Sequence, residues 1–146
     1  MICPRRMIEE STAAWLADPE SDVVWAGDHR GRRGVRMRQT VRDATTVWFE
    51  VGQRTIGIEA YVLSLPPAPS AEVMRQALVR NLGVRRMHFA LDSRNQLFLV
   101  GRIPVEELCP EELDLALGEV WDLVERSLRG LAQAGAEPAG SREKSR

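Results

Sequence analysis

Hydrophobic and polar residues alternate in the middle of the chain, and this period predicts a β-sheet with one buried face. Residues 35–41 alternate almost strictly, as a strand does when every second side chain faces a core. Residues 45–51 and 55–63 are rich in β-branched and aromatic side chains, which predicts two further strands. Because the three segments follow one another closely, we expect a three-stranded antiparallel meander.

Side-chain pairing predicts the register of this meander. A two-residue loop at 52–53, with glycine first as in a type II′ turn, places Phe49 opposite Ile56. A three-residue loop at 42–44 then places Met37 opposite Phe49 on the core side. The outward pairs join an acid to a base, an arginine to an indole, and two threonines. They are Arg36 with Glu50, Arg38 with Trp48, Thr40 with Thr46 and, across the next turn, Trp48 with Gly57.

A second hairpin is predicted from residues 87–92 and 96–103. A three-residue loop at 93–95 joins them, and Asn95 suits the left-handed position that such a loop requires. The resulting cross-strand pairs are Met87 with Gly101, Phe89 with Leu99, and Leu91 with Leu97.

Three segments predict helices. Residues 7–17 end before an Asp-Pro pair, and the residue that precedes a proline avoids the helical region. Residues 70–82 begin with Ser70 as a cap and end before Gly83. The last helix begins at Pro110. The inward residues expected are Ile8, Thr12, Trp15 and Leu16; Val73, Met74, Ala77, Leu78 and Leu82; and Leu113, Leu117, Val120, Trp121, Val124, Leu128 and Leu131.

The order of these elements predicts an α+β layer fold, α-βββ-α-ββ-α, with helices to one side of an antiparallel sheet. Residues 22–28 stay unplaced, although Val23–Trp25 could add an edge strand. We expect one domain over 5–134 and a disordered tail over 135–146, which is small, polar and charged. The expected core contains Met37, Val47, Phe49, Ile56, Ile58, Leu78, Phe89, Leu99, Leu117, Val120 and Trp121.

The composition narrows the class of protein. Of 146 residues, 44% are hydrophobic and 28% are charged, values typical of a globular domain. The net charge of −1 predicts no general attraction to nucleic acid or to anionic lipid. No apolar run follows the basic N-terminal residues, and none is long enough to span a membrane. We therefore expect a cytoplasmic protein whose Cys3 and Cys109 are thiols.

Several phrases of the sequence resemble a known family. They are QTVRDATTVWFEVG at 39–52, MHFALD at 87–92, LFLVGRIP at 97–104 and ELD at 112–114. Over about residues 10–134 the chain resembles actinobacterial members of the YbjN family, whose fold is similar to that of type III secretion chaperones. The resemblance implies a dimer-forming, protein-binding module without enzymatic residues. The loop expected at 29–34, rich in arginine and glycine, has no place in that pattern.

No catalytic or metal-binding constellation is found in the sequence. The histidines His29 and His88 stand at no recognised spacing from Cys3 and Cys109, and neither a C-x-x-C pair nor a phosphate-binding glycine loop is present. We therefore expect no enzyme activity, no cofactor and no metal.

Arginines form a run without one acidic residue between positions 29 and 42. The run indicates either a solvated sheet face with its loop or a patch that binds nucleic acid or another polyanion. Its members are Arg30, Arg32, Arg33, Arg36, Arg38 and Arg42.

Apolar residues on the reverse face of the second hairpin indicate an interface. Phe89 and Leu99 supply its core face, yet Ala90, Phe98 and Val100 alternate with them. Either another part of the chain covers these residues or a second polypeptide does. The leading hypothesis is a chaperone-like or adaptor module, a homodimer that binds a polypeptide; a polyanion-binding module is the alternative. The interface residues expected are Ala90, Phe98, Val100, Tyr61 and Leu63.

Overall fold

The computed structural model describes residues 3–135 and has an α+β fold. Within those residues, three α-helices accompany a six-stranded antiparallel sheet of strand order β1-β2-β3-β4-β6-β5. The predicted tail lies outside the described residues, except for Gly135, which is buried at the end of the last helix. The elements are α1 Pro4–Ala17, β1 Val23–His29, β2 Arg32–Arg38, β3 Ala44–Val51, β4 Thr55–Ser64, α2 Ala71–Arg80, η1 Asn81–Gly83, β5 Met87–Leu91, β6 Gln96–Pro104, η2 Val105–Glu107 and α3 Pro110–Gly135.

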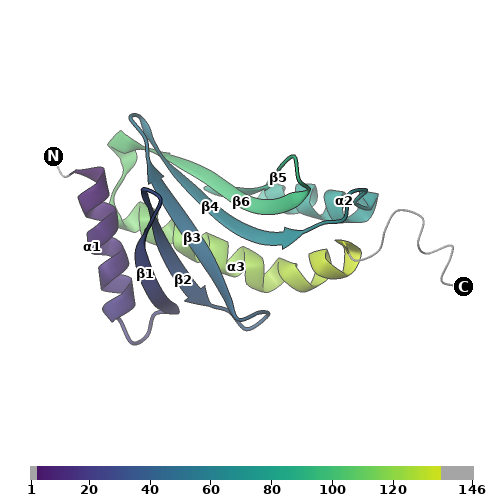
Figure 1. The fold of residues 1–146 in the computed structure, drawn as a ribbon, viewed down its shortest axis with the longest axis horizontal. Coiled ribbons are helices and arrows are strands. Elements are labelled where there is room, and N and C mark those ends of the chain that lie inside the picture. Colours follow the sequence, from purple (N-terminus) through teal and green to yellow (C-terminus); the bar gives the residue numbers. More distant parts are fainter. Residues whose placement is uncertain (1–2, 136–146) are drawn as a thin grey trace, which may run out of the picture.

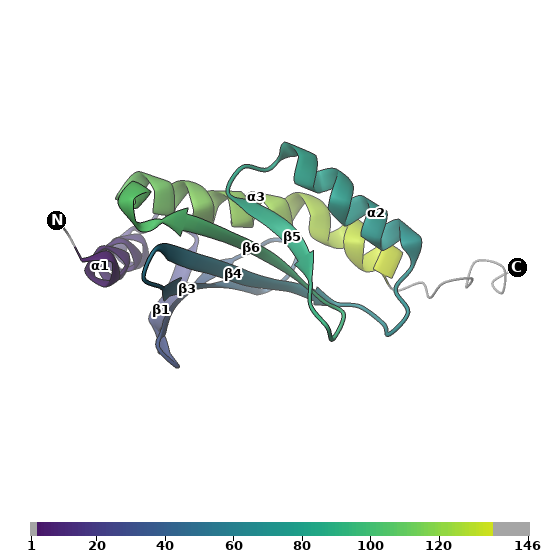
Figure 2. The same ribbon diagram turned by 90° about the horizontal axis from the view of Figure 1, so that it is seen from above.

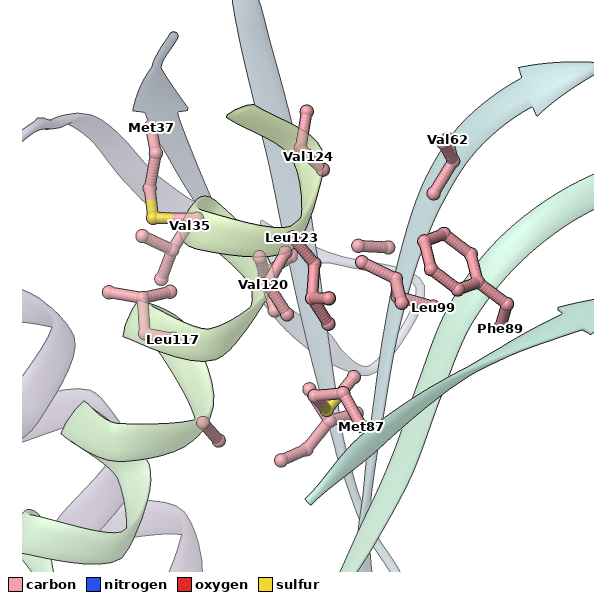
Figure 3. Close-up of a cluster of buried hydrophobic side chains, with 14 of the residues drawn as sticks. Val35, Met37, Val62, Met87, Phe89, Leu99, Leu117, Val120, Leu123 and Val124 are labelled. Atoms are coloured by element: carbon pink, nitrogen blue, oxygen red, sulfur yellow. The ribbon is translucent and has the colours of Figure 1, made fainter. Parts of the chain in front are cut away.

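The helices lie on one face of the sheet (Figures 1 and 2). α3 runs along the sheet, with α1 near one end and α2 near the other. Buried side chains of α3 point toward those of the strands, as Figure 3 shows for Val120 and Leu123 beside Leu99. α1 joins the same layer, because the rings of Trp15 and the buried Phe49 lie 6.4 Å apart. We call this the inner face of the sheet and the opposite one the outer face.

Residues 22–28, which the sequence left unplaced, mostly belong to β1, an edge strand. The loop expected at 29–34 is a tight turn. His29 pairs with Arg32, and Arg30 and Gly31 both have positive φ, of 52° and 79°. Two successive positive φ values are the geometry of a type I′ turn, whose twist matches that of a hairpin. The described residues therefore form four strands before α2.

The predicted register of the first meander is wrong. Phe49 lies opposite Ile58 and not Ile56, because the turn centres on Gln53 and Arg54, with the Gly52 amide donating to the Thr55 carbonyl at 2.9 Å. The predicted outward pairs do not form in that register. Across the other hairpin Val35 pairs with Val47 and Arg36 with Thr46, and Trp48 faces Gly34 and Glu59. Both shifts are even, so the paired residues of β2 and β3 and those of β4 as far as Tyr61 kept their predicted faces.

The first register failed because α3 holds the connection between β2 and β3. The Glu125 carboxylate accepts hydrogen bonds from the Gln39 side chain at 2.7 Å, the Thr40 amide at 2.6 Å and the Thr40 hydroxyl. The Trp121 indole N–H also donates to the Arg38 carbonyl at 2.8 Å. The strand therefore ends at Arg38, and the predicted three-residue loop at 42–44 is replaced by a connection over 39–43. This contact also keeps Trp121 only half-buried instead of in the core.

The second hairpin confirms its prediction pair by pair. Met87 lies opposite Gly101, and Phe89 opposite Leu99. Asn95 has a φ of 61°, in the left-handed region expected for it. Here the turn residues and the apolar alternation both specified the same register.

α2 shows the main error in the predicted core. Ser70 caps it as expected, with its hydroxyl accepting from the Val73 amide at 3.3 Å. Leu78 and Leu82, expected inward, are 66% and 89% exposed. The inward stripe is Val73, Ala77 and then Asn81, the i, i+4, i+8 positions, so Leu78 lies off it. Leu16 of α1 is likewise outward, at 44% exposure.

α3 has the amphipathic pattern expected of it. It begins at Pro110, and its predicted stripe from Leu113 to Leu131 is buried except for the half-buried Trp121. No helix formed by residues 3–135 has the length and apolar character needed to cross a membrane.

Phe49 tests the core. It is 1% exposed, so Phe49→Ala should lower the free energy of unfolding by about 3–5 kcal/mol through lost burial and a residual cavity. Urea denaturation followed by circular dichroism measures this loss. Glu50→Ala, at the neighbouring exposed position, is the control and should change stability little. Equal effects of the two changes would contradict the inward orientation of Phe49.

Glu125 tests the contact between α3 and the 39–41 segment. Hydrogen bonds, chiefly from the Thr40 hydroxyl, lower the pKa of its carboxyl from 4.5 to about 2. A pKa lowered by folding stabilises the protein above the unfolded value, and that contribution disappears as the pH falls from 4.5 toward 2. Glu125→Gln should therefore be less stable than the wild type at pH 7, with a difference that shrinks in acid. Urea titrations along a pH series measure it; a constant difference would refute the assigned titration.

Candidate functional site

The outer face of the sheet carries the candidate functional residues. One row of side chains crosses all six strands, as the pairing of neighbours establishes. No helix of residues 3–135 lies over this face, as Figure 2 shows. The row consists of Gly27, Gly34, Trp48, Glu59, Val100 and His88.

At the β1–β3 end of the outer face, an arginine covers each of two indoles. The Trp48 ring lies so close over Gly34 that a Cβ there would be 2.5 Å from it. On the Trp48 ring lies the guanidinium of Arg32, 5.0 Å from the centroid, which also reaches Glu59 at 3.2 Å. Glycine, indole, arginine and carboxylate thus form one stack. The sequence predicted that Trp48 lies opposite Gly57 of β4. Its partner on β4 is Glu59, and the glycine that its ring covers is Gly34 of β2.

A second indole extends this stack to the edge of the sheet. Trp25 lies over Gly27 of its own strand, and its ring meets that of Trp48 edge-on at 6.3 Å. The Arg36 guanidinium lies 5.2 Å from the Trp25 ring. The signal for this cluster was present in the sequence, since Trp25, Gly27 and His29 alternate as one face of a strand does.

At the β4–β6–β5 end, the outer face carries an apolar cluster on which no arginine of the described residues stacks. Tyr61, Phe98 and Ala90 form one row, and Val100 follows Phe98 on the same side of β6. The rings of Tyr61 and Phe98 meet edge-on at 5.9 Å, and Tyr61 is 42% exposed. We call these four residues, Tyr61, Ala90, Phe98 and Val100, the bare patch.

Leu63 does not belong to the bare patch, although the sequence placed it there. The pairing of β4 with β6 is irregular between Tyr61 and Leu63, so that Leu63 pairs with the buried Leu97. A bulge of this kind turns the following side chain to the other face. Leu63 packs against the core beside Gly135 of α3.

A groove of about 700 Å³ separates the arginine-covered end from the bare patch. Its floor is at Gly57, where a Cβ would meet nothing closer than 3.9 Å. Trp48 and Glu50 line one side, and Val100 and Arg102 line the other. The groove therefore combines an indole edge, an aliphatic side chain and charges of both signs.

Five of the six arginines of the predicted polyanion patch fall into three places. Arg32, Arg36 and Arg38 lie on the outer face, and Arg30 lies in the tip of the first hairpin. On the inner face lies Arg33, which donates to the Thr12 hydroxyl at 2.9 Å. The arginines therefore do not form one patch.

Arg42 has a structural position. Its guanidinium donates to the carbonyls of Tyr61 and Val62, where the bulge interrupts the ladder of β4. It also donates to the Thr45 hydroxyl at 3.0 Å. Burial lowers the pKa of Arg42 below its usual value. Arg42 thus satisfies backbone acceptors and does not point toward a ligand.

The two edges of the sheet differ. At β5, the Asn81 side chain accepts from the Phe89 amide at 2.7 Å and donates to the Phe89 carbonyl at 3.3 Å. The Glu119 carboxylate accepts from the Met87 amide at 2.7 Å. Among the described residues, a side chain bonds the β1 backbone only at Val23, through Ser21. The β5 edge is therefore occupied over these positions, whereas β1 offers free backbone groups to a further strand.

The histidines and cysteines lie on separate elements. His29 is on β1 and His88 on β5, at opposite edges of the sheet. Cys3 precedes α1, and Cys109 precedes α3. Over residues 3–135, no group of three or more potential ligands could hold a metal ion.

Comparison with known proteins finds relatives of undetermined function. The chain is 28% identical over 95 residues to an uncharacterized protein of Mycobacterium tuberculosis (strain ATCC 25618 / H37Rv), covering 65% of this chain and 52% of that protein. It is 29% identical over 91 residues to an uncharacterized protein of Mycobacterium leprae (strain TN), covering 62% and 50%. The chain spans about half the length of these curated relatives. No protein-family model matches it.

The histidines and cysteines belong to different elements of the fold, and their separation leads to a prediction about zinc. The four residues are His29, His88, Cys3 and Cys109. Protein purified without added metal should contain no stoichiometric zinc, because structural zinc requires about four ligands on one ion. Elemental analysis by mass spectrometry measures the content, with Cys109→Ser as the comparison. Stoichiometric zinc in the wild type that is lost in this variant would contradict the prediction.

Proposed function

We propose that the protein is a non-enzymatic, chaperone-like or adaptor module that binds a polypeptide segment on the bare patch. The observation that carries the proposal is the apolar row of Tyr61, Phe98 and Ala90 on a sheet face without a helix over it. A sheet face in contact with water alone is normally polar. Aromatic side chains placed in this way favour contact with another apolar surface.

The groove at Gly57 supports an extended ligand. It continues the bare patch past Val100 toward Arg102 and Glu50, so a segment with an apolar anchor and flanking charges fits its chemistry. The free edge of β1 offers a second mode of contact, in which a segment pairs as an added strand. Such a segment would then lie beside the arginine-covered indoles.

The element order supports a fold like that of type III secretion chaperones and membership of the YbjN family. The order α-ββββ-α-ββ-α is the expected α-βββ-α-ββ-α with the additional edge strand β1 inserted directly after α1. We propose this relationship on the sequence phrases and on that order. The partners of the whole protein are part of the same proposal, since the chain spans about half of its curated relatives.

Polyanion binding is less favoured by the same geometry. Arg32 and Arg36 cover the faces of Trp48 and Trp25, on which bases would otherwise stack. Arg33 and Arg42 do not join them, because their guanidinium groups donate to Thr12 and to the Tyr61 carbonyl within the fold. The two functions differ in their response to salt: polyanion binding weakens steeply as salt rises, whereas apolar contact does not.

Phe98→Asp tests the bare patch. Peptides selected from a random library displayed on phage should be rich in apolar residues and should bind the wild type at low and moderate salt. Phe98→Asp should lower the affinity for these peptides by about 10-fold or more, since it places a charge in the apolar contact. Fluorescence anisotropy with the selected peptides measures affinity.

Two further variants control this experiment. Leu16→Asp, at an exposed apolar position on α1, should bind as the wild type does. Tyr61→Asp, at the more exposed neighbour of Phe98, should weaken binding even if Phe98→Asp disturbs the fold, which circular dichroism checks. Equal affinity of all variants, or binding confined to low salt, would refute the proposal.

A further inference from the structure

Among the described residues, the strands place three glycines on the outer face, and two of them lie beneath an indole ring. A Cβ at Gly34 would be 2.5 Å from the Trp48 ring, and a Cβ at Gly27 would be 2.6 Å from the Trp25 ring. At these two positions the rings leave no space for a larger residue. The third glycine is Gly57 of β4, on the floor of the groove.

The fold does not require a glycine at position 57. The nearest atom to a Cβ there would be the Glu50 carbonyl oxygen, 3.9 Å away, which is an ordinary van der Waals distance. Gly57 also lacks the positive φ that favours glycine. A glycine within a strand weakens it, because it has no side chain to pack, and it often marks the close approach of another molecule. Gly57 therefore leaves a space that a ligand can fill.

Ionisable side chains surround this space, and three of them already have partners. The Arg32 guanidinium binds Glu59 at 3.2 Å, and that of Arg86 binds Glu112 at 2.9 Å. Within residues 3–135, the ionisable side chains that line the groove without forming an ion pair are Glu50, His88 and Arg102.

Glu50 and Arg102 lie on opposite sides of Gly57. Glu50 is its partner on β3 and Arg102 is its partner on β6, and both are exposed. Because neighbouring strands are about 4.8 Å apart, the Cα atoms of these two residues are about 10 Å apart across the groove. An acid and a base at this separation leave room between them for one planar ring.

We propose that the groove over Gly57 binds the indole side chain of a tryptophan from a polypeptide. The ring lies over Gly57 as Trp48 lies over Gly34, and Arg102 contacts its face as Arg32 contacts that of Trp48. The Glu50 carboxylate accepts a hydrogen bond from the indole N–H. Indole suits this site best, because it is the strongest aromatic partner of a guanidinium and because its N–H only donates.

The tryptophan belongs to the segment proposed to bind the bare patch, so the source of the ring rests on the proposed function. Val100 is part of the bare patch and also lines the groove. Arg102 follows it on the same side of β6. A segment on the bare patch therefore reaches Gly57 directly.

N-acetyl-tryptophanamide tests the ring alone. Titrated into the ¹⁵N-labelled protein, it should cause saturable shifts of the Glu50, Gly57 and Arg102 amide signals in NMR spectra. Gly57→Val should raise its dissociation constant by about 10-fold or more, because the added side chain fills a central contact. Gly57→Val should stay folded, since a β-branched residue suits a strand and has space here. Thr46→Val, on the outer face away from the groove, is the control and should bind as the wild type does.

The two charged residues test the recognition of the ring. Glu50→Ala should lower the affinity for N-acetyl-tryptophanamide by about 5-fold or more, through loss of a hydrogen bond to a charged group. It should leave the affinity for N-acetyl-phenylalaninamide unchanged, since a phenyl ring has no N–H. Arg102→Ala should lower both affinities by about 3-fold, the effect of an exposed cation–π contact. Both changes are at exposed positions, so the variants should be folded.

The outcomes separate this site from the proposed function. Absence of a saturable shift at Gly57, or equal affinity of the wild type and Gly57→Val, would overturn the indole site. Selected peptides that lose affinity with Phe98→Asp but not with Gly57→Val would also overturn it and would leave the proposed function intact. Peptides that contain tryptophan and lose affinity with both changes would support it. Binding of N-acetyl-tryptophanamide at Gly57 without binding of any peptide would support the site and refute its polypeptide source.

Discussion

α3 packs its buried stripe along the inner face of the sheet, and the other surfaces of the molecule follow from that contact. Its Leu117 and Val120 lie among strand residues from both halves of the sheet, including Val35 and Leu99 (Figure 3). α1 and α2 join the same layer at its two ends. Because all three helices are used on one face, the apolar residues of the outer face receive no helix from residues 3–135. The bare patch is a direct consequence.

The polar side of α3 also contributes to the fold. Glu125 binds the segment after β2, and Glu119 binds the segment before β5. Each carboxylate accepts hydrogen bonds from backbone amides that have no partner in the sheet. A buried or half-buried amide requires such an acceptor. One helix thereby determines where one strand ends and another begins.

Contacts of this kind explain which parts of the fold the sequence could predict. The second hairpin was correct because its turn and its alternation are local signals that agree. The first register was wrong because Glu125, 85 residues from Thr40, decides the length of the connecting loop, and no local pattern carries that information. The outer position of the bare patch survived the error because strand faces repeat every two residues. Leu78 and Leu82 were wrongly predicted to be buried, because the sequence pattern does not distinguish an apolar residue next to the buried stripe of a helix from one within it.

The side chains that bond the β5 backbone also determine which edge of the sheet can add a strand. An open edge beside an exposed apolar helix would allow two copies to pair as one continuous sheet, and Asn81 occupies the Phe89 groups that such pairing needs. The β1 edge, whose backbone is bonded by a side chain of the described residues only at Val23, is the edge that can accept a further strand. The bare patch lies on the opposite side of the sheet from the helices. Strand addition at β1 and contact on the bare patch, the two modes proposed for a polypeptide, therefore use different parts of the sheet.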